Sequence, residues 1–139
     1  MSKFIVENPI DLLTFLRFDI TAKTLYARHR EKEVENIWAK NVYEHHLNVW
    51  GGFTEKSPKK NGIQDFYNSY HKVLDSIKTS GFDEDKSRIP VSENFLLLNG
   101  AHRVSAAIQY NKPVVCEISS LDSGQLECPS WYFQNKKDI

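Results

Sequence analysis

The segment from Ile89 to Ile118 constrains the fold most, because an apolar run there leads through a glycine turn into an amphipathic helix. The turn reads Asn-Gly-Ala-His-Arg and ends at Arg103. Gly100 allows a sharp bend and a close approach of the backbone to a ligand. The first amides of the following helix lack intrahelical acceptors, and such amides readily bind an anion. The segment therefore predicts a phosphate-binding turn between a strand and a helix.

Side chains of the turn fit the same interpretation. His102 and Arg103 add donors beside the backbone amides, and an arginine can bind two phosphate oxygens at once. Asn99, Gly100 and Ala101 complete the predicted phosphate site. A strand, a glycine turn and a helix also form an ordinary structural unit, so this short motif alone leaves a purely structural interpretation open.

Size and charge bound the class of protein. The 139 residues suit one domain, in which we expect a mainly helical part at 1–62, a core at 63–118 and a tail at 119–139. The 18 basic and 18 acidic residues give a net charge of zero, which disfavours a nucleic-acid binder. Lys56, Lys59 and Lys60 lie close together, and we interpret them as part of a solvated loop.

Cysteine usage and hydropathy indicate an intracellular, cytoplasmic protein. Only Cys116 and Cys128 are present, and no apolar stretch approaches the ~20 residues of a membrane span. We therefore expect no membrane association. Cys116 lies in an apolar run and is predicted to be a small buried hydrophobe. No spacing of cysteine and histidine resembles a zinc site.

Apolar residues at helical spacing predict several helices. One helix is expected to begin at Asn8 and Pro9, and Arg30 to Trp50 is expected to form one long or two short helices. Two further helices are expected at Asp65 to Ser80 and at Ala101 to Tyr110. Short apolar runs predict strands at Ile89 to Val91, Phe95 to Leu98 and Val114 to Ile118. Two further segments are expected outside helices: Phe18 to Ile20 as an edge strand or turn, and Glu55 to Gly62 as an exposed loop.

The segment from Ser80 to Ile118 resembles the ParB and sulfiredoxin superfamily, whose members carry a glycine, a variable residue, His or Arg, and then Arg after a strand. The resemblance implies an α+β fold, with a small mixed sheet, packed helices and a helical amino-terminal half. It also implies that the turn holds nucleotide phosphates.

Individual branches of that superfamily can be compared with the turn. The catalytic cysteine of sulfiredoxin corresponds to Ala101, which cannot attack sulfur. Partition proteins carry an arginine-rich turn and a DNA-binding domain, and this chain has neither. Free serine kinases look closest, because they have His and Arg at the places of His102 and Arg103. They have Asp where this chain has Asn99, whose side chain carries no charge. The candidate magnesium ligands that the resemblance implies are therefore the carboxylates of Asp19 and Glu55.

The amino-terminal half is similar to ParB-like proteins found with bacterial surface-polysaccharide enzymes, through the segment from Asp19 to Ala27 and through Tyr43, His46, Leu47 and Glu55. That similarity implies a sugar or polyol acceptor and a glycosyltransferase as a partner. Lys23 would then contact phosphate, and Asp19 a hydroxyl or metal. The alternative is a surface ion pair at helical spacing. His46 would line the site if its helix faces it.

These resemblances together predict a kinase that uses ATP or another nucleoside triphosphate with Mg²⁺. Its acceptor would be a small hydroxylated compound such as a sugar, a polyol or a serine-like molecule, in polysaccharide biosynthesis. Glu55 would be the base, because serine kinases of the superfamily use a glutamate from the amino-terminal half. His102 and Arg103 would stabilise the transferred charge, and Lys23 and Arg28 would be secondary phosphate contacts. The alternatives are a solvated Glu55 and a non-catalytic nucleotide-binding or interaction module.

Overall fold

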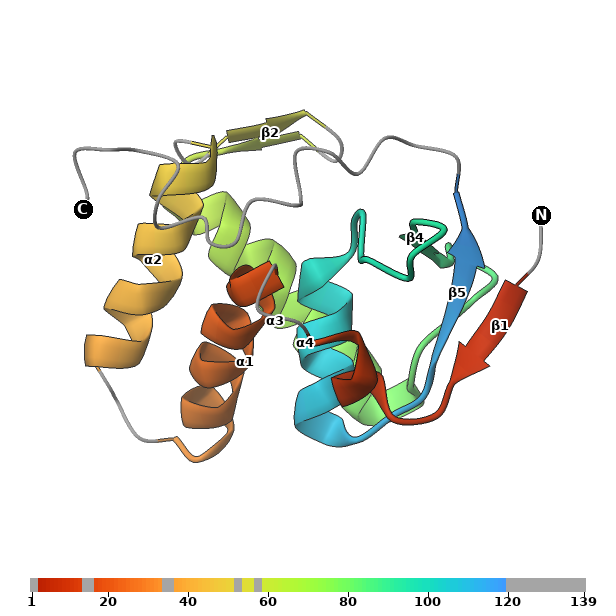
Figure 1. The fold of residues 1–139 in the computed structure, drawn as a ribbon. Coiled ribbons are helices and arrows are strands. Elements are labelled where there is room, and N and C mark those ends of the chain that lie inside the picture. Colours follow the sequence, from red (N-terminus) through yellow and green to blue (C-terminus); the bar gives the residue numbers. More distant parts are fainter. Residues whose placement is uncertain (1–2, 14–16, 34–36, 52–53, 57–58, 120–139) are drawn as a thin grey trace.

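The computed structural model describes residues 3–13, 17–33, 37–51, 54–56 and 59–119 (Figure 1). The described residues form an α+β fold, which confirms the predicted class. The elements in chain order are β1 (Lys3–Val6), the 3-10 helix η1 (Pro9–Leu12), α1 (Phe18–Glu31), α2 (Ile37–Gly51), β2 (Thr54–Lys56), β3 (Lys59–Asn61), α3 (Ile63–Ser80), β4 (Ile89–Val91), α4 (Ala101–Tyr110) and β5 (Val114–Ile118).

The main sheet is mixed and has the strand order β1-β5-β4. β1 runs antiparallel to β5, with Phe4 opposite Cys116, and β4 runs parallel to β5, with Ile89 opposite Cys116. Parallel neighbours need a crossover connection, and α4 supplies it. The chain therefore leaves the carboxyl end of β4 and enters the amino end of α4 nearby, which is where open sheets of this kind commonly bind ligands.

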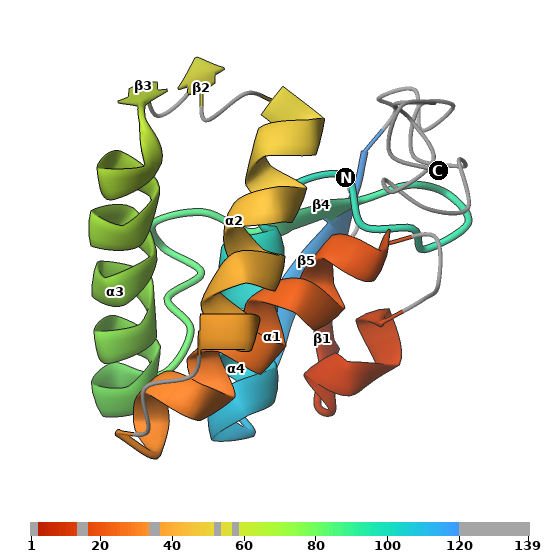
Figure 2. The same cartoon turned by 90° about the vertical axis from the view of Figure 1, so that its left-hand side faces the viewer.

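Two apolar clusters share helices α1 and α4. The cluster against the sheet includes Ile20, Val104 and Ala107, whereas the cluster among the helices includes Ala27 and Ala106. The small side chains of α4 allow α1 and α3 to approach it closely, and Figures 1 and 2 show α4 between the sheet and the other helices. The first turn of α4 thus lies where the two layers meet.

Several elements agree with the sequence predictions. α3, α4, β4 and β5 lie where they were expected, and Gly81 ends α3 with a φ of 77°. The segment from Arg30 to Trp50 is divided between two helices, because Arg30 belongs to α1 and α2 begins at Ile37. The helix predicted from Asn8 is a single 3-10 turn.

The expectations for Phe18 to Ile20 and for Phe95 to Leu98 were wrong. Phe18 begins α1, whose N-cap Arg17 makes no side-chain cap hydrogen bond, so no usual capping residue marks this start. Leu97 forms only an isolated bridge to Val91, and the positive φ of 62° at Phe95 interrupts the extended backbone. β1, by contrast, was not predicted.

The exposed loop predicted at Glu55 to Gly62 is instead a hairpin of β2 and β3, which lies across the ends of α2 and α3 (Figure 2). Its register pairs Glu55 with Lys60. Lys60 is only 7% exposed, and its Nζ lies 4.9 Å from the centre of the Phe66 ring. Lys60 therefore belongs to the protein body, contrary to the solvated loop that the sequence indicated. The side chains of Lys56 and Lys59 lie outside the described part.

Two further predictions concern Cys116 and membrane association. Cys116 is fully buried, as expected, and burial raises the pKa of its thiol to about 11. In the described part of the chain, no helix combines the length and the apolar character that crossing a membrane requires. Cys128 and the predicted tail lie outside the described residues.

Candidate functional site

The predicted glycine turn is present at the amino end of α4. Gly100 has φ 92° and ψ 25°, and its carbonyl accepts a hydrogen bond of 2.9 Å from the amide of Val104. The Gly100 amide donates to Oδ1 of Asn99 at 2.7 Å. Asn99 thus uses its side-chain oxygen within the turn, and no side-chain cap hydrogen bond is found at this helix start. The helix dipole and the first amides give this end a positive character.

Gly100→Ala is expected to destabilise the fold by about 1–3 kcal/mol, because a left-handed residue with a Cβ is strained. The added Cβ would also lie 2.9 Å from Nη2 of Arg103 and 2.9 Å from Cδ1 of Ile89. Gly81→Ala is the matched control, since Gly81 has a φ of +77° but no atom within 4 Å of the new Cβ. Urea unfolding measures both variants, and an equal loss in the two would contradict the close packing at Gly100.

His102 points into the helical layer. Its Nε2 shares a hydrogen bond of 3.1 Å with the Tyr43 hydroxyl, and its ring lies 4.5 Å from the Tyr70 ring. Burial, followed by the positive charges of Lys23 and Lys60 and by His46, holds the pKa of His102 well below its usual value. His102 is therefore a neutral imidazole at pH 7, so it adds no positive charge to the predicted phosphate site.

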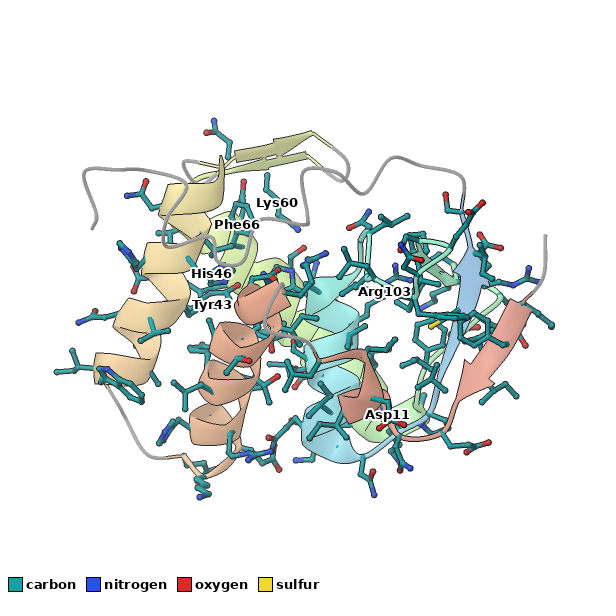
Figure 3. All side chains as sticks on the ribbon, in the orientation of Figure 1. Asp11, Tyr43, His46, Lys60, Phe66 and Arg103 are labelled. Carbon is teal, nitrogen blue, oxygen red and sulfur yellow. The ribbon has the colours of Figure 1, made fainter. Side chains whose placement is uncertain are left out.

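Arg103 lies on the sheet-facing side of α4 (Figure 3). Its Nη1 donates to the carbonyl oxygen of Ser87 at 3.3 Å and also to the hydroxyl of Ser87. Its guanidinium lies 5.8 Å from the centre of the Phe82 ring, and burial lowers its pKa. Successive helical residues point about 100° apart, so the structure does not bring His102 and Arg103 together as predicted.

Two lysines lie near His102 instead; we call Lys23 on α1 and Lys60 on β3 the cationic cluster, and the neutral imidazoles of His46 on α2 and of His102 border it. Figure 3 shows His46 and Lys60 with Tyr43 and Phe66 on this side of α4. Lys23 is 5% exposed and Lys60 is 7% exposed. Lysines are almost never buried to this degree unless they are paired, and Lys23 pairs with Asp19. Two of them beside one helix start make this cluster a candidate anion site.

Asp19 is the carboxylate that borders the cationic cluster in the described residues. Its Oδ1 accepts from Nε of Arg17 at 2.9 Å, and its Oδ2 accepts from Nη2 at 2.8 Å. Nζ of Lys23 lies 3.6 Å from Oδ2. Burial alone would raise the pKa of Asp19, but the hydrogen bonds from Arg17 and the charges of Lys23 and Arg17 hold it well below its usual range.

The environment of Asp19 does not fit a magnesium ligand. Arg17 engages both carboxylate oxygens, so a metal would have to displace hydrogen bonds from a cation. Among the described residues, no group of three or more His, Cys, Asp or Glu side chains could hold a metal ion. Glu55, the other candidate ligand, has its side chain outside the described part. The predicted pair of Asp19 and Lys23 does form, but it is buried rather than on the surface.

The structure does not bring Arg28 to the site. Its side chain is exposed, and its Nε donates to Oε1 of Gln109 at 3.3 Å. Gln109 is in the last turn of α4, and at about 1.5 Å per residue it lies on the order of 13 Å from the amino end. The backbone of Glu55 is placed near the site only through its pairing with Lys60.

Three residues of the site were not identified from the sequence: Arg17, Tyr43 and Lys60. The sequence did not indicate that Lys60 is buried, because its polar neighbours predicted an exposed loop. A signal existed for Tyr43, since it follows Ala39 and precedes His46 and Leu47 on the buried stripe of α2. Tyr70 adds a structural contact, because its hydroxyl donates to the Lys23 carbonyl at 2.9 Å and also contacts Oγ of Ser105 at 2.7 Å. It thereby joins α1, α3 and α4 beneath the cluster.

Comparison with known proteins adds no family to this geometry. No protein-family model matches the chain, and neither the curated proteins nor the solved structures gave a significant match.

Proposed function

We propose that this protein is a nucleoside-triphosphate-dependent phosphotransferase that acts on a small hydroxylated acceptor. One observation carries the proposal: Lys23 and Lys60, which come from distant parts of the chain, are both buried beside the first turn of α4. A polyphosphate is the nucleotide feature that such a site would recognise. The nucleotide is ATP or another nucleoside triphosphate.

The chemistry of the cluster supports the binding of phosphates. Ammonium groups interact with phosphate oxygens through charge-assisted hydrogen bonds, which are about twice as strong as neutral ones. The amino end of α4 adds its dipole and its first amides. Positive groups that are already in place before the reaction stabilise the charge on a phosphoryl group during transfer. Lys23 and Lys60 would supply this stabilisation, and the neutral His102 would hold Tyr43 in position.

Glu55 is the proposed base. Phosphoryl transfer to an alcohol uses a carboxylate that orients the hydroxyl and accepts its proton. The backbone pairing of Glu55 with Lys60 in the hairpin supports this choice. The resemblance to serine kinases and to polysaccharide-associated proteins supports a sugar, polyol or serine-like acceptor and a glycosyltransferase partner. We assign no step to magnesium, because the environment of Asp19 does not fit a magnesium ligand.

Nucleotide loss in the presence of an acceptor tests the proposal. The protein is incubated with ATP or CTP, with and without magnesium, and a panel of sugars, polyols and serine is added. Turnover that depends on one acceptor supports a kinase, and the phosphorylated product identifies the acceptor. Tight nucleotide binding without turnover would reject catalysis, and the absence of binding would reject the site itself.

Lys60→Met is expected to weaken ATP binding by about tenfold or more, because it removes a charge-assisted contact worth about 1.5–3 kcal/mol. Lys72→Met on the exposed face of α3 is the matched control, and its effect should be small. Titration calorimetry at constant ionic strength gives the affinities. Equal affinities of the two variants would show that Lys60 is a structural residue only.

A second candidate is a non-catalytic nucleotide-binding module. Two described side chains favour it, because Asn99 uses its Oδ1 within the turn and Asp19 is engaged by Arg17 and Lys23. Asn99 has no carboxylate and that of Asp19 is engaged, so neither side chain is suited to accept the proton. This candidate predicts the same loss of affinity in Lys60→Met but no acceptor-dependent turnover in the wild-type protein.

A further inference from the structure

A chain of polar contacts runs from the cationic cluster to the segment before the glycine turn. Lys23 contacts Asp19, and Asp19 receives two hydrogen bonds from Arg17. Nη1 of Arg17 then donates to the carbonyl oxygen of Leu97. Arg17 and Lys23 are both less than one tenth exposed. This series of contacts therefore connects α1 with Leu97 through the interior of the protein.

We propose that Asp19 is a positioning residue of the phosphate site. It holds the Lys23 ammonium on one side, and on the other it orients the Arg17 guanidinium that holds the carbonyl of Leu97. Leu97 lies two residues before Asn99, so this contact helps to fix the turn from which the α4 amides point. Asp19 thus aligns the two sources of positive charge, the ammonium and the helix amino end, for one phosphate group.

The sign of the effect separates positioning from simple electrostatics. A carboxylate beside a phosphate repels it, so removing the Asp19 charge would strengthen anion binding if nothing else changed. A positioning role predicts the opposite, because Lys23 and Arg17 lose the partner that orients them. The proposal deepens the proposed function and rests on it, since it assigns Asp19 to the same phosphate site.

Inorganic tripolyphosphate is a suitable probe, and its binding is measured by calorimetry at constant ionic strength. Asp19→Asn is expected to bind it about tenfold more weakly than the wild-type protein, a difference of about 1.4 kcal/mol. Asp19→Glu restores the charge and should recover part of the affinity. Asp75→Asn is the matched control, because Asp75 forms an ion pair with Arg30 at 3.2 Å and its side chain is 65% exposed. Unchanged or tighter binding by Asp19→Asn would overturn the proposal.

A measurement without ligand keeps this test separate from the proposed function. The Leu98 amide donates to the carbonyl of Pro90 at 3.0 Å, and the Gly100 amide donates to Asn99. Asp19→Asn and Arg17→Lys should both accelerate hydrogen exchange at these amides relative to the β5 amides, because the Leu97 carbonyl loses its oriented donor. If the wild-type protein fails to bind tripolyphosphate, the proposed function fails. Unchanged exchange in both variants would then reject the positioning role independently.

Discussion

Glu55→Gln is expected to lower acceptor-dependent turnover by about 10²- to 10⁴-fold, which is the usual contribution of a positioned general base. Glutamine keeps the size of the side chain and can still contact a hydroxyl, but it cannot accept the proton. Nucleotide affinity should be nearly unchanged, because the proposed phosphate contacts come from Lys23, Lys60 and the amides of α4. The variant therefore separates transfer from binding.

Steady-state rates with the identified acceptor give the turnover, and calorimetry with the nucleotide gives the affinity. Glu93→Gln is the matched control, since Glu93 is an exposed residue in the turn after β4 and should retain full activity. A Glu55→Gln variant with normal turnover would remove the base from the proposal. A loss of nucleotide affinity in the same variant would instead give Glu55 a role in binding.

The sequence predicted those elements whose local signals agree with their packing. α3 carries a continuous apolar stripe with Gly81 at its end, and α4 follows Gly100. The apolar periodicity and the glycines at the helix ends therefore indicate the same boundaries. The start of α1 carries no capping signal, because Arg17 occupies the N-cap and its side chain donates to Asp19 instead. The hairpin of β2 and β3 is polar in sequence, so its partly buried surface depends on tertiary contacts such as Lys60 over Phe66.

For the site, the backbone could be predicted but the side-chain directions could not. A glycine before two basic residues identified the turn, whose left-handed Gly100 the structure contains. The directions of His102 and Arg103 depend on which layer packs on each face of α4, and two residues of sequence do not contain that information. Lys23 was identified through the resemblance of the segment from Asp19 to Ala27, whereas its burial and its proximity to Lys60 follow from the packing of α1 and β3.

Acidification below about pH 6.5 is expected to destabilise the protein steeply, because the buried His46 and the half-buried His102 are neutral groups. Burial lowers the pKa of both histidines well below the value of 6.5, and Lys23 lowers both further. Lys60 adds to the effect at His102 and Arg17 to that at His46, whereas Asp19 opposes it at His46. These histidines therefore bind protons in the unfolded chain at a pH where the folded protein excludes them.

The direction of the pH effect follows from this difference in proton binding. Above pH 6.5 neither state binds these protons, and stability is constant with respect to them. Below pH 6.5 the unfolded state gains up to two protons, and each costs the folded state up to about 1.4 kcal/mol per pH unit. The loss continues until the lowered folded pKa values are reached. Asp19 acts only at lower pH, because its carboxylate is ionised in both states well above its ordinary pKa of 3.8, and its stabilising contribution is lost as the pH falls from there toward the lowered folded pKa.

Urea unfolding at about pH 7.5, 6.5, 5.5 and 4.5 measures this dependence. Steps of about one pH unit are fine enough to detect the change in the free energy of unfolding that a single titrating group causes. His46→Gln should reduce the slope between the two lower values, because it removes one of the two groups. His45→Gln is the matched control, since His45 is the exposed neighbour on the same helix. A slope that is equal in the wild-type protein and in His46→Gln would show that His46 is not excluded from protonation in the folded state, and the cationic cluster would then be more open to water than its burial indicates.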